Sequence, residues 1–322
     1  MSNLEPKPEE IACDALDAAG EPVWELLEGR EVALGGTRAM GLSEGAMTVN
    51  RTLPNKVRRM VGAWCFIDHF GGGDADAGTG MLVPPHPHTG LQTVTWLLTG
   101  RVHHRDSVGS SQLIAPGQLN LMTAGRGIAH SEVSPEPGPM HGVQLWVALP
   151  EASRAVAPDF AHHPALPSVA LGSATATVLM GTFAGATSPA VTYTPLVGAQ
   201  LAVAGPATLP LRPEFEYAAQ LLSGSATVEG RSLPPGPLLY LGRGRSSLTV
   251  DGEAEVLLLG GEPFDEEIIM WWNFIGRTHD EIVTFRDDWM AGRFAEVVGF
   301  DGDPLPAPPM PATRLKPRGR TR

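Results

Sequence analysis

The sequence predicts an all-β protein built from two tandem β-barrels, with one helix near the C-terminus. The 38 glycines and 30 prolines together exceed a fifth of the 322 residues, and so many turn-forming residues favour short strands over long helices. Turn signals of the first half recur in the same order in the second half, which indicates an internal duplication. A helical pattern begins only after Gly261.

The strands of the first barrel are predicted from short apolar or alternating runs that end at glycine-rich turns. These runs cover residues 61–70, 91–98, 102–107, 119–123 and 142–149, and a further strand opens at His130. Near the C-terminus, Thr278-His279-Asp280-Glu281 has the form of a capping box. Because Ile282, Phe285 and Trp289 follow at helical spacing, we expect an amphipathic helix that packs on a barrel.

The second half reads as a copy of the first half that keeps the turns and loses the histidines. The stretches 211–216 and 245–251, which flank the repeated segments, contain no histidine. Metal chemistry is therefore expected in the first barrel only. The paired segments are Trp96–Gly100 with Gln220–Gly224, Pro116–Gly117 with Pro235–Gly236, and Gly125–Gly127 with Gly242–Gly244.

Composition divides the chain into five segments. Within the first of them, we expect at most a short helix around residues 12–27. The predicted segments are a mobile leader (1–28), an N-terminal metal-binding barrel (29–152), a linker (153–168), a C-terminal barrel without metal ligands plus the helix (169–300), and a disordered tail (301–322).

Charge and cysteine content exclude several classes of protein. The formal net charge is -12 and the basic clusters are short, so we expect no direct binding of nucleic acid. Two cysteines provide neither a disulfide framework nor a cysteine zinc motif. The N-terminal stretch is polar and acidic, and no apolar run reaches 18 residues. We therefore expect neither secretion by a signal peptide nor a membrane span. We expect a cytoplasmic protein and a monomer.

Two pairs of residues at strand spacing form the candidate metal site. His86 and His88 are two residues apart, as are His130 and Glu132, and side chains at i and i+2 of a strand point the same way. If the pairs converge, they make a site of three histidines and one carboxylate with open positions for substrate or dioxygen. This ligand type suits Fe(II), Mn(II), Co(II), Ni(II), Cu(II) or Zn(II) and does not separate them.

Other residues near these pairs have less specific interpretations. His103 and His104 are adjacent, so only one can face the barrel interior, and neither is favoured as a ligand. Gln144 and Trp146 share a strand face, and one of them is a candidate to line a pocket; the alternative for Trp146 is ordinary packing. Arg126 is a candidate to orient an anion or Glu132, or to stabilise a turn. Four further histidines are interpreted as supporting, surface or linker groups: His69, His141, His162 and His163.

Several motifs resemble the pirin family, whose fold is a bicupin, over residues 50 to 295. The resemblance implies two cupin barrels and the metal ligands His86, His88, His130 and Glu132. Two positions depart from the family pattern, since Thr89 stands where arginine is usual and Gln92 where glutamate is usual; they bear on substrate orientation. The matching motifs are His86–Gly90, Thr93–Thr95, His104–Ser107, Met122–Ile128 with His130–Glu132, His141–Val147, Gly260–Pro263 and Trp272–Phe274.

The resemblance implies an enzyme similar to quercetin 2,3-dioxygenase. One divalent metal ion, Fe(II) before the other candidates, would act with dioxygen on a flavonol or a similar small aromatic substrate, and Glu132 would be both ligand and general base. An alternative of a different class is a regulatory protein that senses redox state through iron and binds a protein partner. A metal-dependent isomerase on the same scaffold is a third reading.

Overall fold

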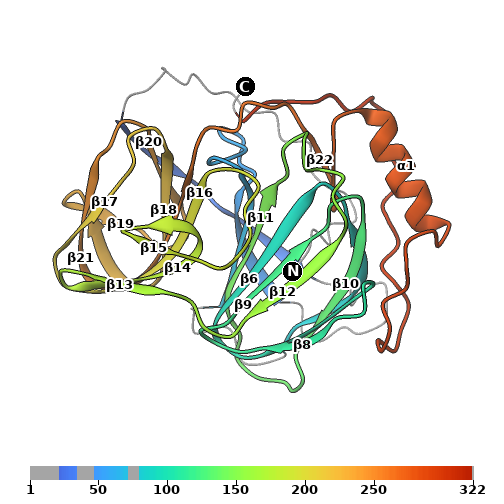
Figure 1. Cartoon of the computed structure of the whole chain (residues 1–322), viewed down its shortest axis with the longest axis horizontal. Helices are drawn as coiled ribbons and strands as arrows, with labels where there is room; N and C mark the ends of the chain where they lie inside the picture. The colour runs from blue at the N-terminus through green and yellow to red at the C-terminus, as the bar shows by residue number, and fades with distance from the viewer. Residues whose placement is uncertain (1–21, 35–46, 72–79, 321–322) are drawn as a thin grey trace.

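The computed structural model describes residues 22–34, 47–71 and 80–320. Two β halves lie side by side, and helix α1 (His279–Met290) lies beside the first half, on the side away from the second (Figure 1). This confirms the predicted all-β class with a C-terminal helix. In the described ranges, no helix has the length and apolar character needed to cross a bilayer.

The first half contains a seven-stranded sheet, in the order β12-β9-β6-β11-β4-β3-β2, and a four-stranded sheet, in the order β5-β10-β7-β8. All of these strand pairs are antiparallel. Their bounds are β2 (Arg30–Leu34), β3 (Met47–Leu53), β4 (Trp64–Phe70), β5 (Leu82–His88), β6 (Leu91–Thr99), β7 (Val102–Asp106), β8 (Ser111–Ile114), β9 (Leu119–Thr123), β10 (Ile128–Val133), β11 (His141–Ala148) and β12 (Asp159–His163).

The second half is one ten-stranded sheet whose main path runs β1-β20-β18-β21-β16-β14-β13. It surrounds its own core of buried aliphatic and aromatic side chains. The strands are β1 (Pro22–Leu27), β13 (Ser168–Leu171), β14 (Ala174–Phe183), β15 (Ala186–Thr187), β16 (Leu196–Ala204), β17 (Ala207–Pro210), β18 (Glu216–Val228), β19 (Arg231–Leu233), β20 (Leu238–Gly242) and β21 (Ser247–Gly261).

Gly100 and Gly224, which are equivalent in the proposed duplication, have the same backbone requirement, although Gly100 lies in the turn between β6 and β7 and Gly224 lies within β18. Gly100 and Gly224 have φ values of 88° and 78°, a region that side chains with a Cβ rarely adopt. A Cβ at Gly100 would lie 2.3 Å from the sulfur of Met140, and one at Gly224 would lie 2.1 Å from the carbonyl oxygen of Glu253. Both positions therefore depend on glycine, but the turn predicted at Gly224 is wrong, because the chain continues there as strand β18.

Buried polar contacts join the two halves. The indole Nε1 of Trp64 donates to the carbonyl oxygens of Val197, at 3.1 Å, and Gly260, at 3.2 Å. The carboxylate of Glu216 accepts from the amide of Gly62 at 2.6 Å and from the hydroxyl of Tyr240 at 2.8 Å. One apolar cluster also contains residues of both halves, so the interface is built like a domain core.

Helix α1 begins where the capping sequence predicts. The amide of Glu281 donates to the hydroxyl of Thr278 at 3.2 Å, which satisfies one of the first helical N–H groups. The side chain of Glu281 accepts from the amide of Arg277 at 2.7 Å, one residue before the cap. The helix packs on a hairpin of β22 (Ile269–Trp271) and β23 (Phe274–Gly276), and so reaches the barrel through this hairpin.

Two predicted boundaries are wrong in the described residues. Residues 22–27, placed at the end of a possible short helix in the leader, form β1, which pairs with β20 and buries Leu27; residues 12–21 lie outside the described ranges. The predicted linker 153–168 contains β12, which pairs with β9 in the first half. In both cases cross-strand pairing outweighs a local composition typical of irregular segments.

The tail predicted as disordered is wrong for residues 301–320. The amide of Leu305 donates to the carbonyl of Pro85 at 2.8 Å, and the indole of Trp289 donates to the carbonyl of Leu305 at 2.7 Å. Near the end of the tail, the guanidinium of Arg320 lies 2.8 Å from the fully buried carboxylate of Glu216. These polar contacts, together with apolar packing of Leu305, Met310 and Leu315 near the hairpin and α1, order a segment whose composition alone is typical of disorder.

We expect Arg320→Ala to lower the free energy of unfolding by about 2 kcal/mol, because a buried carboxylate loses a charged hydrogen-bond donor. Urea unfolding followed by tryptophan fluorescence measures the change. Arg314→Ala is the matched control. Arg314 lies in the same tail and pairs with Asp280 of α1, and both side chains are exposed, so we expect a clearly smaller loss. Equal losses in the two variants would contradict the tail contact.

Candidate metal centre

Strands β5 and β10 bring three histidines together inside the first half. In the antiparallel register His130 lies opposite His86, and His88 is two residues along β5 on the same face. The ring centroid of His86 lies 5.1 Å from that of His88 and 4.4 Å from that of His130. All three side chains are buried, and their ligand atoms fall within 4.8 Å of one another.

Hydrogen bonds determine which nitrogen of each ring carries the proton. The Nδ1 atom of His86 lies 2.7 Å from the carbonyl of Pro84, and that of His88 lies 3.2 Å from the carbonyl of Asn273. A carbonyl can only accept, so both rings carry hydrogen on Nδ1 and leave Nε2 unprotonated when neutral. The Nε2 atoms of His88 and His130 lie 3.2 Å apart.

Burial keeps these imidazoles neutral. It lowers the pKa of His86 to about 4 and holds the pKa values of His88 and His130 well below the usual range. Charged imidazolium is costly away from water, and only the neutral ring can bind a metal. The group is therefore in the protonation state that metal ligation requires.

Glu132 belongs to a second, overlapping group. A register shift after His130 places Glu132 opposite Val83 of β5 and opposite His104 of β7. Ligand atoms of His104, His130 and Glu132 also lie within 4.8 Å of one another. His130 is shared by both groups, and the hydroxyl of Thr95 lies 3.2 Å from the Glu132 carboxylate.

The sequence predicted that one of His103 and His104 faces the interior. His104 is buried, whereas His103 contacts Ser111 on the outer side. The sequence analysis did not predict His104 as part of the site. A pattern that points to it is His104-Arg105-Asp106, because His104 and Asp106 are two residues apart, as are the residues of both predicted ligand pairs.

The wall around the histidines is aromatic and polar. The indole of Trp146 stacks on Phe66 at 4.0 Å between centroids and meets the edge of His88 at 5.1 Å. The amide of Gln144, two residues before Trp146, lies 3.0 Å from the hydroxyl of Thr95. Both Gln144 and Trp146 are buried, so both prove to be interior residues.

The two positions that depart from the family pattern face neighbouring elements. The hydroxyl of Thr89 contacts the carbonyl of Ile275 in the hairpin at 3.4 Å. The amide of Gln92 donates to the hydroxyl of Thr123 at 2.9 Å and to the carbonyl of Val191 at 3.2 Å. Neither position is in the two groups of candidate ligands.

The remaining predicted residues lie outside the histidine group. Arg126 is exposed, so its side chain does not orient the buried Glu132. His162 contacts Asn120 at 2.8 Å in the β9–β12 pair. The Nε2 atoms of His69 and His141 lie 3.0 Å apart on the paired strands β4 and β11. His163 is partly buried in β12.

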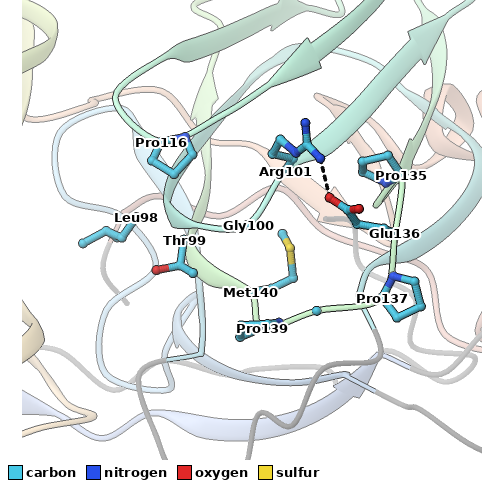
Figure 2. Close-up of a pocket in the computed structure, with 11 residues that line it drawn as sticks. Leu98, Thr99, Gly100, Arg101, Pro116, Pro135, Glu136, Pro137, Pro139 and Met140 are labelled. Atoms are coloured by element: carbon cyan, nitrogen blue, oxygen red, sulfur yellow. Dashed lines mark hydrogen bonds and ion pairs between the residues drawn. The ribbon is translucent and has the colours of Figure 1, made fainter.

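Beside the first half, two open cavities lie away from the histidine rings. One, of about 480 Å³, lies where the β6–β7 turn meets residues 135–140, and Arg101 and Glu136 form an ion pair across it (Figure 2). Both side chains are well exposed, so this pair adds little stability. The other, of about 410 Å³, has Pro85 and Ala129 in its lining, the residues that alternate with the histidines on β5 and β10.

Fold and site together define a two-domain β protein with a buried, metal-capable histidine group in its first half. Residues 46–147 match the family described as Pirin, and residues 196–295 match the Pirin C-terminal cupin domain. The two halves are therefore cupin domains, and the chain belongs to the pirin family.

Relatives of this chain carry names of two kinds. A Pseudomonas aeruginosa protein whose name assigns it provisionally as a quercetin 2,3-dioxygenase is 48% identical over 274 residues, covering 83% of this chain and 87% of the relative. A pirin-like protein of Caulobacter vibrioides is 38% identical, covering 82% and 95%. The crystal structure of quercetin 2,3-dioxygenase from Acinetobacter baumannii matches with a TM-score of 0.84 and 41% identity, covering 91% of this chain and 97% of that one.

The His69–His141 pair predicts a pH dependence of stability. Burial, and to a smaller extent His141, lowers the pKa of His69 from 6.5 to about 4. Between these values the unfolded chain takes up a proton at His69 that the folded chain does not, so this residue's contribution to stability falls as pH drops below 6.5. From pH 7 to pH 5 the loss should be roughly 2 kcal/mol.

Urea unfolding at both pH values measures this loss of stability. Metal-free protein is used because metal binding is itself linked to proton release. We expect His69→Gln to have a weaker pH dependence than the unmodified chain, by roughly 2 kcal/mol over this interval. The same pH dependence in both proteins would show that His69 titrates normally in the folded state.

Proposed function

We propose that this chain is a metal-dependent dioxygenase for a flavonol-like substrate, with His86, His88, His130 and Glu132 as metal ligands. The observation that carries the proposal is the group of three buried, neutral imidazoles, two of which have their Nδ1 atoms at backbone carbonyls. The similarity to proteins named as quercetin 2,3-dioxygenases supports the reaction class.

The donor set fits a divalent first-row metal. The Nε2 atoms of His88 and His130 lie 3.2 Å apart, and two unprotonated nitrogens this close repel each other unless a cation lies near both. Nitrogen and carboxylate donors suit Fe(II), which we expect, as well as the other metals named above. A bound metal would supply Lewis-acid activation of the substrate hydroxyl and a binding position for dioxygen.

Gln144 and Trp146 are suited to hold an oxygen-rich planar substrate. Among the described residues, neither the amide nitrogen of Gln144 nor the indole nitrogen of Trp146 has a hydrogen-bond partner. A buried donor without an acceptor costs about 1–3 kcal/mol, which an acceptor on a substrate would offset. The stacked Trp146 and Phe66 rings offer a flat apolar surface beside His88.

Glu132 is the proposed proton acceptor. Its carboxylate is buried among histidines, next to the hydroxyl of Thr95. A flavonol hydroxyl must lose its proton before the ring is attacked, and a positioned carboxylate can receive it. In this role Glu132 would move a proton at its carboxylate oxygen while the histidines stay neutral.

The activity test is aerobic incubation of Fe(II)-loaded protein with quercetin, following loss of its visible absorbance and uptake of oxygen. We expect turnover in the unmodified chain and a loss of about 100-fold or more in Glu132→Gln. Glu136→Gln is the matched control, because Glu136 is exposed at the turn-side cavity. Elemental analysis of protein purified without added metal identifies the metal and gives each variant's loading. Absence of quercetin loss in the loaded, unmodified chain would reject this substrate.

A second test separates substrate binding from packing. Trp146→Phe keeps one ring beside Phe66 but removes the indole N–H and the volume of the fused ring. We therefore expect KM to rise about 3- to 10-fold, as for one lost hydrogen bond, with little change in kcat and with a loss of stability from the small cavity. Trp64→Phe is the comparison, because the Trp64 indole donates to two backbone carbonyls; we expect it to lower stability and leave KM unchanged. An unchanged KM in Trp146→Phe would remove Trp146 from substrate binding.

A further inference from the structure

Three buried side chains form a line from a surface turn to the histidine group. The Nε2 atom of His104 lies 3.0 Å from a carboxylate oxygen of Asp106, and its Nδ1 atom lies 3.3 Å from the Nδ1 atom of His130. The other oxygen of Asp106 accepts from the amides of Val108 and Ser110 at 3.0 and 2.9 Å. Asp106, His104 and His130 are all at most 2% exposed.

The carboxylate of Asp106, at the outer end of this line, determines which nitrogen carries the proton in His104 and in His130. An ionised carboxylate only accepts, so His104 carries its proton on Nε2 and presents an unprotonated Nδ1. That nitrogen can only accept, so His130 must donate to it from its own Nδ1. The Nε2 atom of His130 is then unprotonated where it faces the Nε2 atom of His88, 3.2 Å away.

The tautomer of His130 is not fixed by its Nδ1 partner alone. His86 and His88 contact the carbonyls of Pro84 and Asn273, which can only accept. The Nδ1 atom of His130 instead contacts another imidazole, which can donate or accept. The ring of His104 is also held in plane, because it stacks on Phe160 of β12 at 4.3 Å between centroids with an interplanar angle of 16°.

We propose that His104 and Asp106 are positioning residues that fix the tautomer of His130, so that its Nε2 atom is presented to the metal. This inference rests on the proposed metal site. It assigns His104 to the support of His130 and not to direct ligation. Partners of metal-bound histidines of this kind are worth about 10- to 100-fold in metal affinity.

The first measurement is zinc affinity, by titration of metal-free protein against a competing chelator. His104→Phe keeps a ring against Phe160 and loses the acceptor, so we expect zinc affinity to fall about 10- to 100-fold. His104→Gln loses the ring but keeps an acceptor, and we expect affinity within about threefold of the unmodified chain. His103→Gln, on the outer face of the same strand, is the matched control and should not change affinity.

The second measurement is the tautomer, by long-range ¹⁵N–¹H NMR of the zinc-loaded protein. We expect hydrogen on Nδ1 of His130 and on Nε2 of His104. Asp106→Asn can present an amide N–H to His104, which would move the His104 proton to Nδ1. The Nδ1–H groups of His104 and His130 would then face each other as two donors. We expect to see this tautomer change in the spectrum and a zinc affinity about 10- to 100-fold weaker.

The outcomes separate the two proposals. No zinc binding by the unmodified chain would reject the metal site itself. Zinc binding that is equal in the unmodified chain and His104→Phe, or equally weakened in His104→Phe and His104→Gln, would overturn the positioning role alone. A second zinc ion per chain that is lost in both His104 variants would also overturn it, because His104 would then be a ligand.

Discussion

The antiparallel pairing of β5 with β10 is the constraint on which the site depends. It places His86 opposite His130, and a slip of one residue would turn either strand's histidines out of the interior. Backbone contacts help to hold the register, because the carbonyl of Pro85 accepts from the amide of Leu305 in the tail, and the amide of Ala129 donates to the hydroxyl of Ser107. The tail and the turn after β7 thus stabilise the two strands that carry the histidines.

Elements distant in sequence complete the interior of the first half. The hairpin β22–β23 brings the carbonyl of Asn273 to His88, and β12 brings Phe160 to His104. Each contact restricts a ring that is free to rotate in an isolated strand. The rings are therefore positioned in part by segments that follow the strands of the site in sequence, which explains why the C-terminal region belongs to the same folded unit as the site.

Period-two spacing was enough to predict that His86, His88 and His130 point inward, because strand geometry alone decides which face a side chain takes. The capping residues of α1 and the turns at Gly100 and Gly125–Gly127 were equally local, and they were predicted correctly, whereas the turn expected at Gly224 is part of strand β18. The role of His104 was not local, since it depends on the β7–β10 register that places it opposite Glu132. The ordered tail and β1 depend on long-range contacts, such as the pairing of β1 with β20 and the ion pair of Arg320 with Glu216, which composition does not encode.

The two halves divide stability and chemistry between them. The interior of the first half holds buried polar groups, including the pair Arg51–Asp68 with a 2.7 Å contact as well as the histidines, and burying such groups costs free energy. The core of the second half is mainly aliphatic and aromatic, although Glu216 and Gln220 are also fully buried there. Because one apolar cluster runs through the interface, burial there offsets part of that cost. The apolar contacts with the second half thus help to stabilise a first half whose interior is partly polar.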